Sequence, residues 1–493
     1  MRNGQQYIES LRDGRCVYVH GERVADVTRH PAFHGIARTI ASLYDTAIDP
    51  ANDMVHTNPE TGTTGNKAFM IPRSPEDLKQ RRQAILTWAR LTNGLVGRGP
   101  DHVASSIAGM AAAADLFAGA RPEFGENVKR WYRKLVDEDL YLVYVIVPPQ
   151  VDRSASAHQQ EEQFIQVGVV REEDSGMVVR GAQMLGTGAA VANWVNVSCI
   201  VPLKPGDEDY ANTFMVPLDA PGLKVYCRPP YALGKTSVFD YPLSTRFDES
   251  DALVVFDDVF VPWEDVFVYR DVELLRNQYH GAPAHVLQNN QAQLRLIVKM
   301  QFIAGLARKI AAMTRVDTFP SVQERLAELA SLASIVEGME LASEANCSID
   351  RYGVAKPDPR FLYGAMGLQA ELYPRALHIL RELAGGGMVQ VPSSYHELVN
   401  PETAPDIKRY VRSPGVDSAE RIKLLRLAWD LVGTEFGGRH QQYEMFYAGA
   451  PYVAKGYTYR NYRWEEPLGL VDAFLQTYDL ETAEPTAPPD ASG

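Results

Sequence analysis

The spacing of apolar residues changes twice along the chain, and this change limits the folds that the chain can adopt. Helical spacing prevails to about residue 140, strand-like runs follow without any helix between them, and helical spacing returns near residue 270. A doubly wound parallel sheet is excluded, because it needs a helix between successive strands. The pattern predicts a multi-domain α+β chain with four segments: a mostly α-helical N-terminal domain (1–140), a central antiparallel β domain (141–270), a C-terminal α-helical bundle (271–480) and a disordered tail (481–493).

Local signals place individual elements. Ser74 and Pro75 predict a helix start, because serine is a favoured N-cap and proline suits the first helical position. Asp417 and Asp358 mark two further starts, and Ser321-x-x-Glu324 matches a capping box. The turn at 173–176 predicts a β-hairpin.

Charge and cysteine content narrow the function. The 493 residues carry 49 Lys and Arg against 62 Asp and Glu, a net charge of −13 that disfavours nucleic acid and anionic membranes as partners. No C-x-x-C pair occurs, so we expect neither a disulfide framework nor a metal site. Without a leader or an apolar span, the chain is expected in the cytoplasm. The cysteines are Cys16, Cys199, Cys227 and Cys347.

Three glycine-containing motifs each have a structural and a functional interpretation. Gly186-Thr187-Gly188 lacks the third glycine and the βαβ setting of a dinucleotide fingerprint, which leaves a plain loop or a close approach by a planar cofactor that Thr187 contacts. In Gly97 to His102, Arg98 and His102 at a helix start suit an anion site or a surface turn equally well. Phe436 to His440 is more typical of one helix end followed by a new helix than of a cofactor contact through Arg439.

Six motifs in a fixed order carry a resemblance that covers residues 5 to 470. They are Tyr7–Arg15 (YIESLRDGR), His30–Phe33 (HPAF), Gly97–Asp101 (GRGPD), Pro242–Glu249 (PLSTRFDE), Phe256–Trp263 (FDDVFVPW) and Phe436–Arg439 (FGGR). Together they resemble the 4-hydroxyphenylacetate 3-hydroxylase large-component family, the oxygenases of two-component flavin systems. The resemblance implies an acyl-CoA-dehydrogenase-like fold and a homotetramer built as a dimer of dimers.

The resemblance also implies an activity. FADH2 would come from a separate NAD(P)H-dependent flavin reductase, and O2 would be the co-substrate. A flavin C4a-hydroperoxide would then hydroxylate a phenolic substrate at the ortho position. Whether that substrate is a free small molecule or tethered to a carrier stays open.

Site residues follow from the same resemblance. Arg98 is expected to contact the phenol oxygen, while His102 and Tyr144 relay or orient the proton, with His and Tyr swapped relative to many members. The expected substrate-binding set is Arg98, His102, Tyr144, Ser198 and Cys199. The expected cofactor-binding set is Tyr144, Val145, Ile146, Gln150, Val151, Asp152, Arg153, Thr187, Arg439, Tyr447, Ala448 and Gly449. Because FAD is anionic, local positive charge is expected at Arg98, Arg153 and Arg439.

Two other functions remain open from the sequence. A flavin-dependent acyl-CoA dehydrogenase or dehydratase would need a carboxylate base, for which Glu435 is a candidate. No cysteine lies between Cys16 and Cys199, which disfavours an iron–sulfur dehydratase. A non-catalytic member of the fold is the third reading.

Overall fold

The N-terminal region is built from short and medium helices packed around buried aromatic and aliphatic side chains. The computed structural model describes residues 1–447 and 449–480. Ser74 caps the third helix by accepting a hydrogen bond from the Asp77 backbone N–H, 3.1 Å, and Pro75 occupies its first position, as predicted. The helices are α1 (Gly4–Ser10), α2 (His34–Ile48), α3 (Pro75–Leu91), α4 (Pro100–Ala112), α5 (Ala114–Ala118) and α6 (Pro122–Glu138).

The central region holds two sheets. Strand order is β2-β1-β10-β11-β7-β6 in the larger sheet and β12-β9-β8-β5 in the smaller one. The pairs β1–β10 and β5–β8 are parallel and the other pairs are antiparallel. The strands are β1 (Val17–Val19), β2 (Glu22–Arg23), β5 (Leu142–Val145), β6 (Gly168–Glu173), β7 (Gly176–Gln183), β8 (Trp194–Val197), β9 (Thr213–Pro217), β10 (Leu223–Cys227), β11 (Ala252–Pro262) and β12 (Val266–Val268). The β6–β7 hairpin confirms the turn predicted at 173–176.

The N-terminal segment contributes to the larger sheet. Val17 pairs with Val225 in a parallel register, so β1 extends the sheet beyond β10. Two small hairpins lie outside both sheets: β3 (Val55–Thr57) with β4 (Thr64–Asn66), and β13 (Ser348–Ile349) with β14 (Ala355–Lys356).

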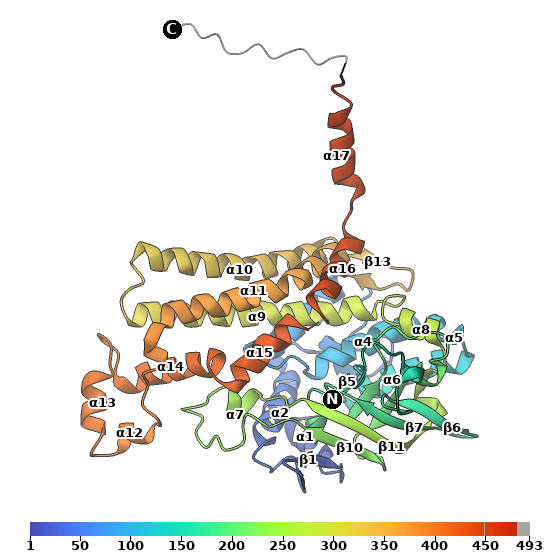
Figure 1. The fold of residues 1–493 in the computed structure, drawn as a ribbon, viewed down its shortest axis with the longest axis horizontal. Coiled ribbons are helices and arrows are strands. Elements are labelled where there is room, and N and C mark those ends of the chain that lie inside the picture. Colours follow the sequence, from blue (N-terminus) through green and yellow to red (C-terminus); the bar gives the residue numbers. More distant parts are fainter. Residues whose placement is uncertain (448, 481–493) are drawn as a thin grey trace.

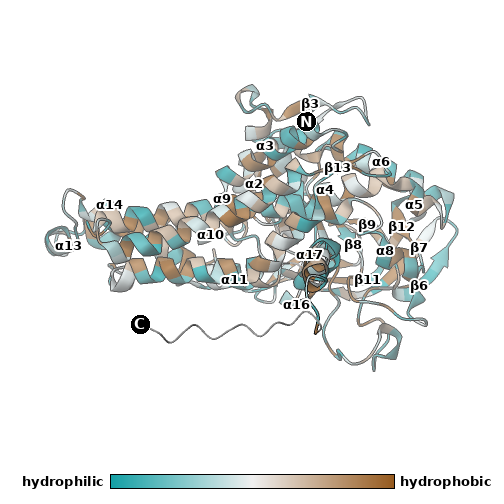
Figure 2. Cartoon of the chain, turned by 90° about the horizontal axis from the view of Figure 1, so that it is seen from above, coloured by the Kyte–Doolittle hydropathy of each residue, from teal (hydrophilic) through white to brown (hydrophobic). Residues whose placement is uncertain are grey.

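Three long helices form the body of the C-terminal region: α9 (Ala284–Met313), α10 (Pro320–Ala345) and α11 (Pro359–Ala384). They lie side by side and extend away from the β-rich half of the molecule (Figures 1 and 2). The bundle confirms the predicted α, β, α order. The shorter helices are α7 (Ser244–Phe247), α8 (Val272–Asn277), α12 (His396–Val399), α13 (Ala404–Tyr410), α14 (Ser418–Val432), α15 (Glu435–Met445), α16 (Pro451–Asn461) and α17 (Glu465–Leu475).

One predicted helix signal is wrong. Helix α10 begins at Pro320 behind Phe319, with no side-chain cap bond, so Ser321 and Glu324 form no capping box. Proline fixes φ in the helical range and has no N–H to satisfy, so the helix has already begun before Ser321. Asp417, in contrast, does cap α14 by accepting from the Glu420 N–H, 2.9 Å.

The predicted disordered tail, 481–493, lies outside the described residues. None of the helices in the described part of the chain combines the length and apolar character needed to cross a membrane.

Helix α4 crosses α9 at a glycine, and this contact is testable. A Cβ added at Gly109 would lie 2.4 Å from the Ala284 Cα. We therefore expect Gly109→Ala to lower the free energy of unfolding by about 1–3 kcal/mol, because the two backbones must separate. Denaturant unfolding followed by circular dichroism measures this change.

Gly305→Ala in α9 is the matched control, since nothing lies within 4 Å of its added Cβ. Alanine there should stabilise the helix by about 0.5–1 kcal/mol. Equal effects of the two substitutions would contradict the close α4–α9 contact.

Candidate functional site

The turn between α3 and α4 holds Arg98 by its backbone. The Arg98 N–H donates to Glu249 Oε1, 2.6 Å, and its carbonyl accepts from the Tyr141 hydroxyl, 2.7 Å. Gly97 is required because an added Cβ would lie 2.3 Å from the Tyr443 hydroxyl oxygen. Pro100 then starts α4. These contacts fix the direction in which the Arg98 side chain leaves the turn.

The Arg98 guanidinium lies among three tyrosine rings, which we call the Arg98 cage: Tyr144, Tyr443 and Tyr447. Its central carbon is 4.9, 5.3 and 4.6 Å from the respective ring centroids. Burial alone would lower the pKa of Arg98, but Tyr144, the other two tyrosines and Glu249 outweigh it and the pKa is raised. The guanidinium thus stays charged, and three aromatic rings surround it.

His102 completes this group from α4 and is fully buried. Its Nε2 contacts a guanidinium nitrogen of Arg98, and its Nδ1 is 2.9 Å from Gln291 Oε1. Its ring centroid is 5.6 Å from that of Tyr144. Burial, and then the charge of Arg98, hold the pKa of His102 well below its usual value, so the ring is neutral. The structure therefore brings Arg98, His102 and Tyr144 together.

Ser198 and Cys199 follow β8 and lie beside the strand that carries Tyr144. The Ser198 N–H donates to the Val145 carbonyl, 3.1 Å. Tyr279 is hydrogen-bonded to Ser198 and lies near Tyr144, and burial raises the pKa of Tyr279 above its usual value. Burial raises the pKa of the Cys199 thiol to about 11, which keeps it protonated.

Beyond Tyr144 the chain leaves an apolar surface exposed. Val145 and Ile146 are buried, whereas the segment 150–153 is exposed. The Met184 N–H donates to Val147, 2.7 Å, and the Ile200 N–H donates to Ile146, 2.9 Å, so the segments around 184 and 200 flank this stretch. Val151, Leu185 and Ile200 are 66%, 55% and 50% exposed.

Thr187 and Arg439 meet in an ionic cluster centred on Asp251. The Thr187 hydroxyl donates to Asp251, 2.6 Å, and Arg439 and Arg228 both pair with the same carboxylate, 2.7 and 2.9 Å. Glu249 also pairs with Arg439, 3.2 Å. The positive charge expected at Arg439 is therefore present, and two carboxylates far away in the sequence compensate it.

Several of the motif glycines lie where the chain packs closely on itself. An added Cβ at Gly186 would lie 3.2 Å from Val145, and one at Gly188 would lie 2.5 Å from the Tyr141 hydroxyl. Residues 186–188 lie in the connection between β7 and β8. The change of helix before Phe436 is confirmed, because α14 ends at Val432 and Thr434 caps α15. A Cβ added at Gly437 would lie 2.3 Å from the Leu431 carbonyl oxygen.

Sequence reasoning missed four residues of the site: Glu249, Tyr279, Gln291 and Tyr443. Tyr443 had a usable signal, because 439, 443 and 447 are spaced by one helical turn. Glu249 ends the motif Pro242–Glu249, and nothing in the sequence around it indicates a contact with Arg98. Tyr447 is in the cage, Gly449 is in the exposed turn before α16, and Ala448 lies outside the described residues.

A buried ionic network stands behind Tyr443. Glu444 accepts from Arg295, 2.7 and 2.9 Å, from Lys299, 2.7 Å, and from Gln369, 2.6 Å. Burial would raise the pKa of Glu444, but Arg295 and Lys299 outweigh it and lower the pKa to about 2. Burial lowers the pKa of Lys299 to about 8. The network fixes α15 against α9 and α11.

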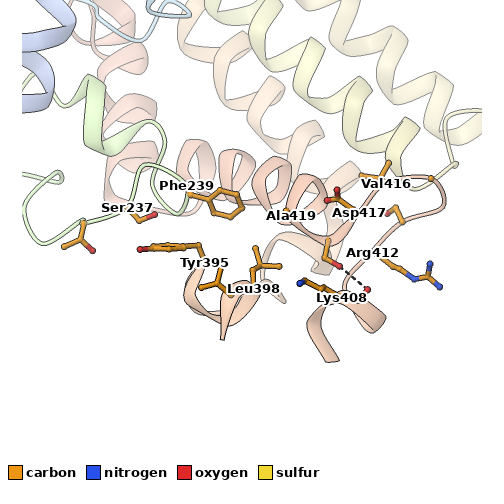
Figure 3. Close-up of a pocket in the computed structure, with 14 residues that line it drawn as sticks. Ser237, Phe239, Tyr395, Leu398, Lys408, Arg412, Val416, Asp417 and Ala419 are labelled. Atoms are coloured by element: carbon orange, nitrogen blue, oxygen red, sulfur yellow. Dashed lines mark hydrogen bonds between the residues drawn. The ribbon is translucent and has the colours of Figure 1, made fainter. Parts of the chain in front are cut away.

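A separate cavity of about 1010 Å³ lies at the far end of the bundle (Figure 3). Phe239 and Tyr395 line one part of it, and Lys408 and Arg412 lie at another. No residue of the predicted site lines this cavity.

Comparison with known proteins decides the family. The family model described as 4-hydroxyphenylacetate 3-hydroxylase N terminal matches residues 3–268, and the corresponding C terminal model matches residues 275–476. The chain belongs to the 4-hydroxyphenylacetate 3-hydroxylase family. This confirms the resemblance carried by the six motifs.

Individual members of this family are similar over nearly the whole chain. A Streptomyces globisporus monooxygenase of a carrier-bound (3S)-3-amino-3-(3-chloro-4-hydroxyphenyl)propanoyl group is 40% identical, covering 90% of this chain and 84% of that protein. The Thermus thermophilus 4-hydroxyphenylacetate 3-monooxygenase oxygenase component is 37% identical, covering 96% and 97%. A crystal structure of such a component, complexed with FAD and 4-hydroxyphenylacetate, has a TM-score of 0.91 at 36% identity, covering 97% and 99%.

The Glu444 network gives a prediction about stability. Glu444→Gln keeps the shape but leaves the buried charges of Arg295 and Lys299 uncompensated. We expect a loss of about 3–5 kcal/mol in the free energy of unfolding, measured by denaturant titration. Glu435→Gln on the exposed first turn of the same helix should change it by less than about 0.5 kcal/mol. A loss at Glu444 as small as this control would contradict the proposed importance of the network.

Proposed function

We propose that this protein is the oxygenase component of a two-component flavin monooxygenase that hydroxylates a phenol ortho to its hydroxyl group. The observation that carries the proposal is the Arg98 cage beside the neutral ring of His102. A permanent cation enclosed by rings suits a planar aromatic substrate with an oxygen that becomes anionic. The relatives from Streptomyces globisporus and Thermus thermophilus are both named for substrates that contain a hydroxyphenyl ring.

The residues present fit a flavin. The exposed apolar side chains of Val151, Leu185 and Ile200 offer a surface on which a planar ring system can pack, and the Thr187 hydroxyl retains acceptor capacity beside it. When bound, reduced FAD would supply the two electrons that activate O2, so that one oxygen atom of O2 enters the substrate and the other leaves as water. The residues that would hold it are Tyr144, Val145, Ile146, Gln150, Val151, Asp152, Arg153, Thr187, Arg439, Tyr447 and Gly449, with Ala448 between the last two.

Each side chain in the cage has a distinct role in the proposal. Arg98 binds the phenol oxygen and stabilises its negative charge, which a buried cation does more strongly than one in water. His102, being neutral, can accept the phenolic proton at Nε2. Tyr144 closes the cage over both groups, and Ser198 and Cys199 border the substrate on the β8 side. The buried surroundings keep water from the reacting groups.

A thioester dehydrogenase is less well supported. That reaction needs a carboxylate base held against the flavin, and Glu435, the candidate from the sequence, is exposed on the first turn of α15. Two other carboxylates, those of Glu249 and Asp251, lie nearer to Arg98. Both form ion pairs with Arg439 instead.

The relatives are oxygenase components, so a separate reductase supplies reduced flavin. We further propose a homotetramer, and helix α17 supports it. This helix stands away from the bundle (Figure 1), and its Leu470 and Phe474 are 76% and 67% exposed. Large apolar patches of this kind mark contact surfaces.

The four cysteines are unpaired, which favours a reducing cytoplasm.

The activity has a direct test. The purified protein, given chemically reduced FAD, O2 and a panel of para-substituted phenols, should form catechols that chromatography with mass spectrometry detects. Acyl-CoA thioesters serve as the comparison substrates. The proposal would be wrong if no phenol yielded a catechol, or if a thioester were oxidised instead.

The same assay tests the role of Arg98. Arg98→Lys keeps the charge but not the planar, delocalised group among three rings. We expect it to lower kcat/KM about 100-fold, since one preorganised donor is worth about 2.7–4 kcal/mol in such sites. Arg308→Lys, on the exposed face of α9 and outside the proposed site, is the control and should leave kcat/KM unchanged.

The tetramer is tested on α17. Leu470→Glu together with Phe474→Glu places charges one turn apart on the same face of the helix. In the tetramer these charges would be buried, so we expect a smaller assembly by sedimentation velocity at unchanged helix content. Glu465→Gln with Glu466→Gln is the matched control. An unaltered mass for the charged variant would contradict the assignment of this face to the subunit contact.

A further inference from the structure

A chain of hydrogen bonds runs from Arg98 into the protein interior through α9. Arg98 contacts His102 at Nε2, and His102 Nδ1 is 2.9 Å from Gln291 Oε1. The Gln291 side chain is in turn hydrogen-bonded to Asp101. His102, Gln291 and Asp101 are each at most 4% exposed, so water does not substitute for any of these partners.

The two ends of this chain determine its direction. A guanidinium can only donate, so His102 Nε2 must accept and the ring proton must lie on Nδ1. An ionised carboxylate can only accept, so the Gln291 amide nitrogen must face Asp101 and its oxygen must face His102. Each hydrogen bond in this chain is therefore donated in the direction from Arg98 toward Asp101. Turning the Gln291 amide around would break two buried hydrogen bonds at once.

We propose that Gln291 is a positioning residue, which holds His102 as the Nδ1–H tautomer so that Nε2 presents its lone pair to Arg98 and to the phenol. This inference rests on the function proposed above. In this reading Arg98 and Gln291 enforce the same tautomer from opposite sides of the ring. Gln291 alone retains it when the guanidinium binds substrate oxygen, which keeps His102 ready to accept a proton.

No other group that the structure describes near this chain of hydrogen bonds competes with Gln291 for His102. The Tyr447 hydroxyl is 3.5 Å from His102 Nδ1, too long to compete with Gln291. Tyr144 faces the ring from β5, and the charge of Arg295 on α9 opposes protonation of His102, as that of Arg98 does. None of these groups offers Nδ1 a better acceptor.

Asp101 makes the arrangement sensitive to pH. Burial raises its pKa to about 6, although Gln291, Arg81 and Arg295 act against this. Below that pH the carboxyl gains a proton and can donate, so it no longer dictates which end of the amide faces it. We therefore expect Gln291 to fix the Nδ1–H tautomer of His102 less strongly as the pH falls through about 6.

The tautomer can be observed without turnover. The imidazole nitrogens of ¹⁵N-histidine-labelled protein report it by NMR, and loss of the signal in His102→Asn assigns it. In Arg98→Met, Gln291 acts alone, and we expect the Nδ1–H form to persist. In Arg98→Met with Gln291→Leu, we expect a mixture of tautomers. The same Nδ1–H signal in both variants would overturn the proposal.

Turnover provides the second readout. Gln291→Leu should lower kcat about tenfold at nearly constant KM, as misorientation of a proton-accepting group would. It should also remove the acid limb near pH 6 from the pH profile. Gln291→Glu, protonated toward Asp101, still presents an oxygen to Nδ1 and should recover most of the rate. Gln288→Leu is the control, because Gln288 lies on the same helix, is 8% exposed and has an unpaired amide nitrogen.

The possible results are distinguishable. Equal pH profiles for Gln291→Leu and Gln288→Leu would overturn the positioning role. If no phenol is hydroxylated while the NMR signals follow the expected pattern, the hold of Gln291 on His102 stands and the proposed function fails. If a phenol is hydroxylated but the tautomer is indifferent to Gln291, the function stands and the inference fails.

Discussion

A charged guanidinium held among tyrosine rings is the interaction around which the site is arranged. Arg98 is surrounded by the faces of Tyr144, Tyr443 and Tyr447, and its backbone is fixed by Glu249 and Tyr141. A cation removed from water is costly unless something compensates it. Here polarisable rings and a neutral imidazole do so, which leaves the charge available to a substrate oxygen.

Helix α9 connects this site to the rest of the molecule. Although almost every residue of its first half is buried, it carries Asn290, Gln291, Arg295 and Lys299. Buried polar groups need partners. Asn290 accepts from Arg81 on α3, 2.5 Å, Gln291 accepts from His102 on α4, and Arg295 and Lys299 donate to Glu444 on α15. One helix thereby fixes α3 and α4, which flank Arg98, and α15, which carries Tyr443.

Much of the fold could be predicted where the signals are local. The Ser74 cap, the hairpin at 173–176 and the Asp417 cap depend on residues within a few positions of each other. The capping box predicted at Ser321 does not form, and the reason is equally local, because the helix already begins at Pro320. Compensation of Arg439 could not be predicted, because Glu249 and Asp251 lie about 190 residues away in the sequence.

The sequence by itself determined the α, β, α order, the family and the pairing of Arg98 with His102 four residues later, because periodicity and motif spacing are properties of one continuous segment. Only the tertiary structure decided that Tyr443, Gln291 and Glu249 meet at that pair, that Arg439 is neutralised and that several of the motif glycines lie where the chain packs closely on itself. The physical reason is that periodicity fixes which face of an element is buried, whereas the packing of distant elements decides which buried faces meet.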